Sequence, residues 1–441
     1  MQLLRKILVS LLFLSTIYFA QEYHSPSDTS SFVVSDIKII GNKETKAYVI
    51  LNELTFKVGD KINWKILSYN RDRIYGLKIF NFVDIVTDNR KDKKRIIIVV
   101  KETWTIFPIP YFYFRRNSIK YSAYGINFLY KNFRGRNETL SANLGFGFDP
   151  NFFIRYNNPN FFYRNLIFGF TIGYTNFFNK SVNFLTISKE DFNYKSFYTG
   201  FNLGKRVNIF HQFEFGFLYR YITLKKPYAY LYLSSGKNFE YEPSLSFSYK
   251  YDTRDLVLRS RKGTYLQLSL THYGFILSDI HFLDFSFDYR KYFPVNKILF
   301  FKYRITNRYL IGDKIPIYDR SYIGYNNYIR GHLHDVKEGK NMFIASFELG
   351  VPLVEEYDFV MKLPLIPESL TSARIGLDLN TFVDIGNTYD SLRELSLKQR
   401  NLFGYGVSLN LLILPFNALR FEIAFNEFGN SEFIFESGFS F

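Results

Sequence analysis

The sequence of 441 residues contains no cysteine, and its six histidines are scattered. Without cysteine the chain forms neither disulfides nor thiolate metal sites, and this absence is compatible with an oxidising compartment. None of the histidines lies at the spacing of a helical metal site. We therefore expect no bound metal and no cofactor.

Catalytic motifs and long apolar runs are also missing. The sequence has no HExxH, GxSxG or P-loop motif, so we expect no enzyme activity. No run of about eighteen apolar residues follows the N-terminal region, which excludes membrane-spanning helices there. The net charge is +16. Because Lys and Arg are scattered among aromatic residues, this charge favours an anionic lipid surface over nucleic acid as a partner.

The N-terminal residues have the pattern of a secretory signal peptide. Arg5 and Lys6 precede an apolar core that ends at Phe19, and we expect cleavage after Ala20. A retained anchor is the alternative. Residues 21–31 form a polar linker to the first folded domain.

Residues 32–103 predict a small α+β unit. A strand ends at the turn signal Gly41-Asn42, two helical segments follow, and Asn63 is positioned to cap the second of them. Two alternating segments joined by a charged turn then predict a hairpin. The expected order is strand, helix, helix, strand, strand.

From Trp104 onward apolar and polar residues alternate with a period of two. Leu419, Phe421 and Ile423, for example, alternate with polar or small residues. We count about sixteen such segments, each about ten to thirteen residues long and capped by Tyr and Phe, which is typical of a transmembrane β-barrel with an apolar face toward lipid. Closure of the wall would satisfy every backbone group.

A long polar connection, residues 311–341, interrupts this alternation and contains Arg330. An arginine in a narrow interior is costly unless a carboxylate meets it. The segment at 372–386 places Asp384 on the same inward face as Asp378 and Phe382. We therefore expect the connection to fold inward and Arg330 to pair with Asp384. The alternative is that both are solvated polar residues of the lumen.

Three stretches of the small unit resemble a POTRA domain, the periplasmic module of outer-membrane assembly proteins. They are residues 37–42, 54–60 and 76–83. The resemblance implies an exposed strand edge at Phe82, Val83, Asp84 and Ile85 that can add a client strand. The alternative is a rigid spacer below the barrel.

The remainder resembles the BamA/TamA family of outer-membrane assembly and translocation proteins. Tyr328-Ile329-Arg330-Gly331-His332 is similar to the arginine-glycine-aromatic loop tip of that family, with His332 in place of the aromatic residue. Phe382-Val383-Asp384-Ile385-Gly386 is similar to its inward strand motif, which implies that Arg330, Gly331, Phe382, Asp384 and Gly386 hold the loop in the lumen. Asp252, Arg254, Asp255 and Gly263 are similar to its periplasmic turn.

The last residues resemble the sorting signal of outer-membrane barrels, with Gly438, Phe439 and Phe441 at the matching positions. In this family the barrel closes at a weak seam between its first and last strands. Pro108 and Pro110 remove two hydrogen-bond donors from the first strand, which would weaken pairing at that seam. The alternative is that they mark a linker and that the strand starts later.

The sequence thus predicts an all-β transmembrane barrel of about sixteen antiparallel strands (residues 104–441) with an N-terminal POTRA domain (residues 32–103). The expected site of action is the bacterial outer membrane, with the POTRA domain in the periplasm. The expected function is insertion or translocation of unfolded outer-membrane or secreted proteins, in contact with outer-membrane lipids and with periplasmic chaperones or accessory subunits. A passive pore or receptor, and a secretion channel for one exoprotein, are the alternatives.

Overall fold

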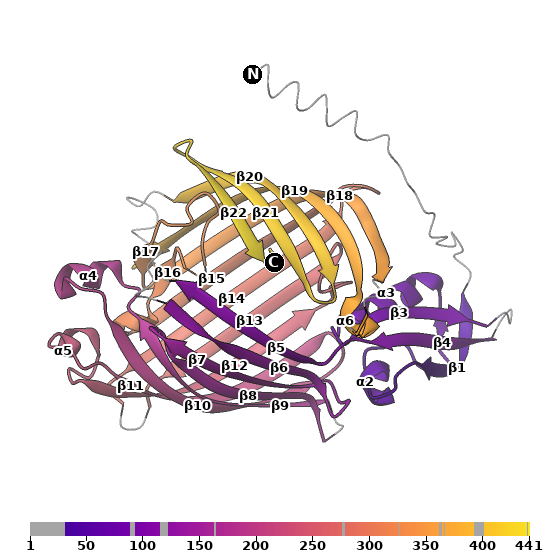
Figure 1. Cartoon of the computed structure of the whole chain (residues 1–441), viewed down its shortest axis with the longest axis horizontal. Helices are drawn as coiled ribbons and strands as arrows, with labels where there is room; N and C mark the ends of the chain where they lie inside the picture. Colours follow the sequence, from indigo (N-terminus) through magenta and orange to yellow (C-terminus); the bar gives the residue numbers. More distant parts are fainter. Residues whose placement is uncertain are drawn as a thin grey trace, which may run out of the picture.

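The computed structural model describes residues 31–88, 93–114, 122–162, 165–275, 278–325, 327–360, 364–365, 367–391, 401–438 and 440–441. The predicted signal peptide and nearly all of the predicted linker lie outside these residues, as does Phe439. Two bodies follow one another along the chain, a small α+β domain and a large curved sheet (Figure 1). Within the described residues, no helix has the length and apolar character needed to cross a membrane.

The small domain has the predicted strand–helix–helix–strand–strand order, with one additional short strand. Its sheet has the order β2-β1-β4-β3, with β1 parallel to β4. The Asn63 side chain caps α3 by accepting a hydrogen bond from the Ile66 backbone N–H at 3.1 Å. Buried Leu67 and Ile74 of α3 pack against the sheet. The elements are β1 (Phe32–Ile40), α2 (Ala47–Leu51), β2 (Lys61–Ile62), α3 (Trp64–Tyr75), β3 (Phe80–Thr87) and β4 (Lys93–Glu102).

The large sheet has sixteen strands, and each pairs antiparallel with its neighbours along the chain. This confirms the predicted barrel class. The strands are β5 (Ile106–Phe114), β6 (Ser122–Phe133), β7 (Glu138–Gly147), β8 (Asn151–Phe161), β9 (Leu166–Phe178), β10 (Asn193–Arg206), β11 (His211–Thr223), β12 (Phe239–Asp252), β13 (Gly263–Tyr273), β14 (His281–Pro294), β15 (Phe300–Lys314), β18 (Asn341–Val360), β19 (Ser372–Tyr389), β20 (Leu402–Leu414), β21 (Asn417–Asn426) and β22 (Ser431–Ser437).

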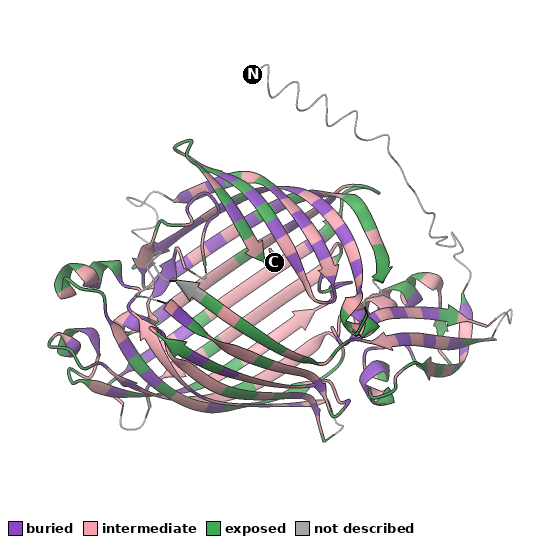
Figure 2. Ribbon diagram, viewed as in Figure 1, coloured by how far each residue is buried: buried purple, intermediate pink, exposed green. Residues whose placement is uncertain are grey.

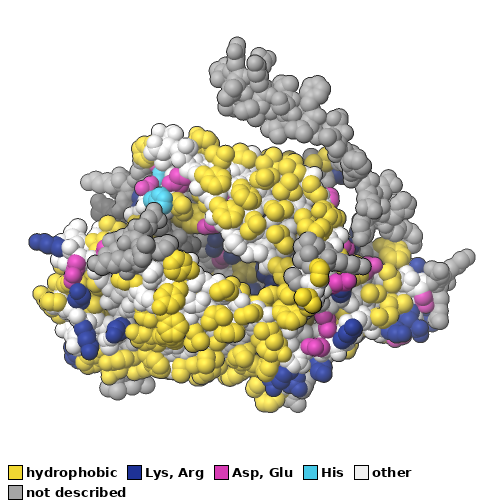
Figure 3. All heavy atoms as spheres, viewed as in Figure 1, with side chains coloured by type: hydrophobic (Ala, Val, Ile, Leu, Met, Phe, Trp, Pro, Cys, Tyr) yellow, Lys and Arg dark blue, Asp and Glu magenta, His cyan; other side chains and the backbone are white. Residues whose placement is uncertain are grey.

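The two faces of the large sheet differ in kind. Burial alternates along the strands, most regularly in β18 to β21 (Figure 2). The exposed outer positions are large and apolar, with Phe433 67% and Phe215 63% exposed, whereas the carboxylates of Glu348 and Glu422 face a buried interior. Hydrophobic side chains cover most of the visible outer face, and charged side chains lie in a hollow near its centre (Figure 3). An exposed apolar outside with a polar inside is the arrangement of a membrane barrel.

The wall is not continuous, contrary to the expectation of closure. β5 and β22 are the two ends of the sheet, and among the described residues they do not pair with each other. Pro108 and Pro110 give β5 two positions without a backbone donor. β22 stops at Ser437, and Gly438 turns the chain with φ +142°. Both ends of the sheet thus carry features that weaken pairing.

The connections contain structure that alternation does not predict. We call the end of the barrel that contacts the small domain the near end, and the opposite one the far end. The connection predicted at 311–341 begins only after β15 ends at Lys314, and it contains a 3-10 turn and a hairpin. The additional elements are α4 (Val182–Ser188), α5 (Ala229–Tyr232), η3 (Ile317–Asp319), β16 (Ser321–Ile323) and β17 (Lys337–Gly339) at the far end, and α6 (Glu368–Thr371) at the near end.

Candidate functional site: an inward loop and the near-end turn

The connection between β15 and β18, hereafter the inward loop, crosses the far end of the barrel. On one side, the Asp319 carboxylate accepts a hydrogen bond from Arg220 of β11 at 2.8 Å, and Arg220 also pairs with Glu242 of β12. Close by, the Ser181 hydroxyl donates to Glu338 at 2.7 Å. On the other side, Arg330 contacts strands β18 to β21. The loop is therefore bound to two parts of the wall that are far apart in the sheet.

Arg330 is the centre of the second contact. Its Nε and Nη2 donate to the two oxygens of Asp384 at 2.6 and 2.7 Å, a bidentate pair. Its Nη1 donates to Glu348 at 2.9 Å and to Glu422 at 3.2 Å. The guanidinium also stacks over the Phe382 ring, 3.7 Å from its centroid. We call these five residues the Arg330 cluster.

The charges around this cluster balance. Three carboxylates surround one guanidinium, but Glu348 also receives Lys302 at 2.7 Å and Glu422 receives Arg420 at 3.3 Å. Asp384, by contrast, has Arg330 as its one ion-pair partner among the described residues. Because all members are nearly buried, removal of Arg330 leaves the Asp384 carboxylate without a counter-charge in a dry site.

Glycines allow the loop to approach the wall. Gly331 adopts φ +92°, and a Cβ there would lie 2.7 Å from the Phe425 carbonyl oxygen. A Cβ on Gly404 of β20 would lie 1.6 Å from the Arg330 carbonyl oxygen, and one on Gly386 would lie 2.8 Å from the Ile329 side chain. The backbone of the loop thus lies directly on β19 and β20, where a side chain would hold it away.

Apolar contacts extend the loop tip to the last strand. Ile329 is buried in a cluster with Ile323 and residues of β18 and β20. Tyr328 and Leu333 pack against a second cluster that contains Ile434 of β22. The Leu333 backbone N–H donates to the Glu432 carboxylate of β22 at 3.1 Å. The loop tip therefore spans the strands from β18 to the edge of the sheet.

His332, at the position where an aromatic residue is usual, makes ion pairs instead of a stack. Its Nδ1 lies 2.6 Å from Asp335 and its Nε2 lies 2.6 Å from Glu427. Burial alone lowers the pKa of His332, but the hydrogen bonds with Asp335 and Glu427 outweigh it and raise the pKa above its ordinary value. The imidazole thereby fastens the loop tip to the turn between β21 and β22.

The near-end turn between β12 and β13 holds the predicted turn residues together. Arg254 pairs with Asp252 at 2.8 Å and lies over the Tyr265 ring. Gly263 has φ +118°, and a Cβ there would lie 2.4 Å from the Thr253 carbonyl oxygen. Burial raises the pKa of Asp255 to about 6, opposed by backbone N–H groups of the turn such as that of Arg261.

Arg259 of this turn enters the barrel, which the sequence did not indicate. Its Nε donates to Asp378 of β19 at 3.0 Å and its Nη1 donates to Glu356 of β18 at 2.7 Å. Arg261 and Arg374 lie within 3.9 Å of the same two carboxylates. We call Arg259, Asp378 and Glu356 the Arg259 cluster.

The small domain docks on this turn. Leu256 and Leu258 of the turn belong to one buried apolar cluster with the core of the small domain. Arg374 of β19 lies over the Tyr75 ring of α3, 4.5 Å from its centroid. Glu53 of the small domain pairs with Arg206 of the barrel at 2.7 Å. The domain and the near end therefore share both apolar and ionic contacts.

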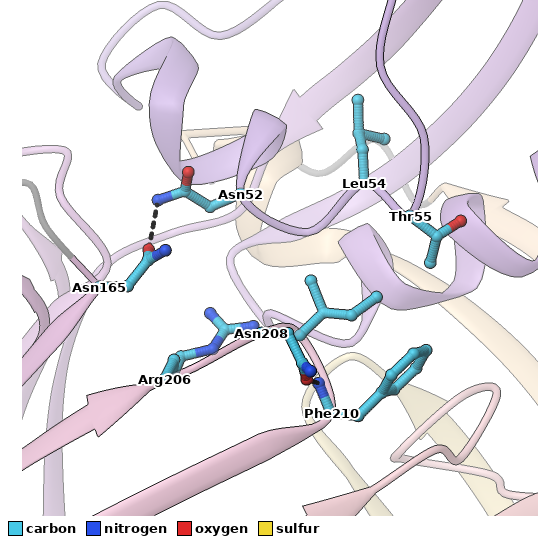
Figure 4. Close-up of a pocket in the computed structure, with 8 residues that line it drawn as sticks. Asn52, Leu54, Thr55, Asn165, Arg206, Asn208 and Phe210 are labelled. Atoms are coloured by element: carbon cyan, nitrogen blue, oxygen red, sulfur yellow. Dashed lines mark hydrogen bonds between the residues drawn. The ribbon is translucent and has the colours of Figure 1, made fainter. Parts of the chain in front are cut away.

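A groove of about 330 Å³ lies at the same joint (Figure 4). It runs between the end of α2 and the turns that precede β9 and β11. Asn52 donates to Asn165 across it at 3.1 Å. Its other lining residues are Leu54, Thr55, Arg206, Asn208, Ile209 and Phe210.

The remaining predicted residues lie at edges. β3, with Phe82, Val83, Asp84 and Ile85, is an edge strand that pairs only with β4 in its sheet. Val83 and Ile85 are buried in the core of the small domain. Gly438 follows β22, and Ser440 and Phe441 contact Lys302 on the inner face of β15.

Sequence reasoning missed Glu348, Glu422 and Gly404 as partners of the loop, and Lys302 as the partner of Glu348. Each lies at an inward position of a predicted strand, so alternation assigns its face but not its partner. A search for buried-facing charges within the alternating segments would have found the three charged residues. Gly404 is detectable only once the loop that approaches it is known.

Two models of known protein families match the chain. The family model described as the Omp85 superfamily domain matches residues 132–441. The chain belongs to the Omp85 superfamily. A second model, the POTRA family described as surface antigen variable number repeat, matches residues 32–103. A search of the curated proteins finds no match.

Solved structures of Omp85 proteins share the fold. BamA from Haemophilus ducreyi lacking POTRA domains 1–3 is 16% identical with a TM-score of 0.54, and the alignment covers 92% of this chain and 84% of that one. CdiB from Escherichia coli is 12% identical with a TM-score of 0.52 and coverage of 99% and 95%. CdiB from Acinetobacter baumannii is 17% identical with a TM-score of 0.50 and coverage of 92% and 73%.

Family membership places the barrel in the outer membrane and the POTRA domain in the periplasm. The near end is therefore periplasmic and the far end extracellular. Members of the Omp85 superfamily are non-enzymatic assembly or translocation proteins that handle unfolded outer-membrane or secreted proteins. At this family level the function is insertion into, or translocation across, the outer membrane.

Proposed function

We propose that this chain is an insertion factor for outer-membrane β-barrel proteins. The observation that carries the proposal is the unpaired seam between β5 and β22, combined with a loop tip that is fixed to β18–β22, on one side of that seam. Each seam edge offers backbone N–H and C=O groups to an incoming strand. A client strand that pairs there satisfies its backbone before it faces lipid.

The Arg330 cluster has a specific task in this mechanism. A closed barrel keeps its shape because every strand has two neighbours, whereas the β22 side of an open seam lacks that support. Arg330 connects β18, β19 and β21 through Glu348, Asp384 and Glu422. The loop thus keeps this half of the wall in one shape while the edge strand exchanges partners.

The POTRA domain delivers clients to the seam. Its edge strand β3 lies beside the connection that leads into β19, where the Asn81 side chain donates to the Ser369 carbonyl oxygen at 2.8 Å. Extended clients add to β3 by strand pairing. The shared apolar core with Leu256 and Leu258 holds this edge at a fixed place below the barrel.

A passive pore or receptor is disfavoured by the inward loop, because a loop bound to both sides of the far end obstructs steady conduction. A secretion channel for one exoprotein remains the second candidate, because secretion and insertion use the same barrel and POTRA arrangement.

Depletion of the protein in its native host, followed by an outer-membrane proteome, separates these functions. Loss of many barrel proteins is the expected result. Loss of a single exported protein would support dedicated secretion instead, and an unchanged proteome would support the pore. Complementation with the wild-type chain and with an Asp384→Arg chain completes the design, since only the former should restore the barrels.

A further inference from the structure

The last two residues of the sequence, Ser440 and Phe441, lie inside the barrel against residues beneath the inward loop. β22 ends at Ser437, and Gly438 has a left-handed φ of +142°. Beyond it, the Ser440 hydroxyl lies 2.5 Å from Lys302 Nζ, and that ammonium lies over the Phe441 ring, 4.6 Å from its centroid. Residues 440 and 441, hereafter the end segment, are therefore held by a side chain of β15 on the inner wall.

Glu348 connects the end segment to the loop. Its Oε1 accepts from Arg330 at 2.9 Å. Its Oε2 accepts from Lys302 at 2.7 Å, from Asn380 at 3.0 Å and from the Ser440 hydroxyl at 3.3 Å. One oxygen of Glu348 thus binds Arg330 of the inward loop, and the other binds Lys302 and Ser440, the residues that fix the end segment after β22. Its side chain is only 1% exposed, so water cannot replace a lost partner.

We propose that Glu348 couples the position of the inward loop to the position of the end segment, so that release of one loosens the other. When the end segment leaves Lys302, the Glu348 carboxylate loses its hydrogen bond from Ser440, and its remaining ion pairs readjust. If Lys302 moves away with the segment, Glu348 also loses the Lys302 ion pair. In either case the Arg330 side of the carboxylate is perturbed. Coupling of this kind is reciprocal, so a change at Arg330 also alters the end segment.

The role of this coupling rests on the proposed function, because that function assigns the seam between β5 and β22 to the entry of clients. Opening of the seam requires the end segment and β22 to move. Because Glu348 contacts both the end segment and Arg330, this movement changes the contacts of the inward loop. The loop would then be released only when the seam is engaged. The test below measures distances and uses no insertion activity, so it fails or succeeds independently of the proposed function.

The absence of native cysteine makes the test direct, since introduced cysteines are the only sites of spin labelling. The seam pair is Phe112→Cys on β5 with Phe433→Cys on β22, two exposed positions. The loop pair is Asn327→Cys in the loop with Tyr230→Cys in α5, also exposed. Distances are measured by pulsed electron resonance on the full chain in lipid nanodiscs.

The test variant is Lys302→Met, and its control is Lys250→Met. Lys250 lies on the inner face of β12, where alternation with exposed Leu245 and Phe247 places it. Among the described residues it forms no hydrogen bond or ion pair with the loop or the end segment. We expect Lys302→Met to shift the populations of both label pairs by roughly tenfold, the effect of a lost charged hydrogen bond. Lys250→Met should leave both distributions unchanged.

Two further variants make the inference falsifiable even if Lys302→Met folds poorly. Ser440→Ala removes one hydrogen bond and should shift both label pairs in the same direction by a smaller factor. Arg330→Met should shift the seam pair as well as the loop pair. A seam shift in Lys302→Met or Ser440→Ala without any loop shift overturns the coupling, and so does an equal response in the Lys250→Met control.

Discussion

The two ends of the barrel are each held by an arginine that enters from a connection, but the surroundings of these arginines differ. At the extracellular end, Arg330 comes from a long loop and binds three carboxylates. At the periplasmic end, Arg259 comes from a short turn, donates hydrogen bonds to two carboxylates and lies 3.5 Å from that of the largely exposed Glu355. Next to Arg259, Leu256 and Leu258 join the core of the POTRA domain. The extracellular contact is thus centred on one guanidinium with small apolar clusters beside it, whereas the periplasmic contact joins the core of a second domain.

Because of this difference, we expect the two ends to tolerate the loss of their arginine to different degrees. Asp384 has one ion-pair partner among the described residues, whereas Asp378 retains Arg261 at 3.9 Å and Glu356 retains Arg374 at 3.9 Å when Arg259 is removed. Apolar packing also depends less on angle than a bidentate pair does. We therefore expect the loop to be either bound in the lumen or fully released when the Arg330 cluster is disrupted. The periplasmic joint should instead lose stability in smaller steps.

Charge reversal at Asp384 should give the largest effect. Asp384→Arg places a second guanidinium against Arg330 and removes its bidentate acceptor, which costs at least about 3–5 kcal/mol in a buried site. The loop should leave the lumen, and the protein should fail to assemble or lose function. The measurement is outer-membrane level together with protease sensitivity of the loop. The control is Asp36→Arg, which reverses a carboxylate that is 54% exposed on the POTRA surface. Normal level and function in Asp384→Arg would refute the role of the pair.

Truncation of Leu258 should have the second largest effect, at the periplasmic end of the barrel. Leu258 is 1% exposed between the barrel and the POTRA core, and a buried Leu→Ala change costs about 2–4 kcal/mol. Hydrogen exchange should rise in α3 and in the turn at 253–262, while the inward loop keeps its protection. Val257→Ala, at an exposed neighbouring position, is the control. Equal loss of protection in the loop would show that the two ends are not independent.

Removal of Arg259 should rank third. We expect Arg259→Met to destabilise the joint by about 1–3 kcal/mol, less than the matched Arg330→Met, because neighbouring arginines and the apolar contacts with the POTRA core remain. Unfolding of both variants in the same detergent gives the difference directly, with Arg95→Met on the POTRA surface as a control. An equal or larger loss for Arg259→Met would contradict the comparison.

The His332 contacts should give the smallest effect, and it should depend on pH. The folded-state pKa of His332 lies above its unfolded value, so its ion pairs stabilise the loop fully below about pH 6.5 and the contribution is lost as pH rises through the folded-state pKa. Because Asp335 is 61% exposed, the change should stay below about 1 kcal/mol. Protease sensitivity of the loop should increase with pH in the wild type and stay constant in His332→Gln. If the protease sensitivity of the wild-type loop does not change with pH, the His332 ion pairs do not stabilise the loop.

Much of the fold is readable from the sequence because lipid imposes a strict alternation. Phe421 and Ile423 face outward and Arg420 and Glu422 face inward, and no other arrangement keeps the charges out of lipid. The inward position of Asp384 follows from the same parity. The strand count follows as well, since each apolar segment needs one crossing of the membrane.

The rest depends on information that alternation does not contain. Glu348 meets Arg330 because of the registers of β18 and β19, and register is fixed by many weak pairings along both strands. α4 was missed because Val182–Ser188 mixes β-branched and polar residues without a helical stripe. The family resemblance and the two prolines predict a weak seam, but alternation does not show that the seam is unpaired, because an edge strand and a paired strand alternate in the same way.

In the proposed mechanism, the seam between β5 and β22 opens to admit a client strand. In the cysteine-free chain, a scan of cysteine pairs along these two strands will identify a pair that cross-links in high yield. The measurement is insertion of an unfolded barrel protein into liposomes that contain this cross-linked variant, before and after reduction. We predict that insertion is lost in the oxidised form and returns on reduction, whereas full insertion through a cross-linked seam would contradict the account.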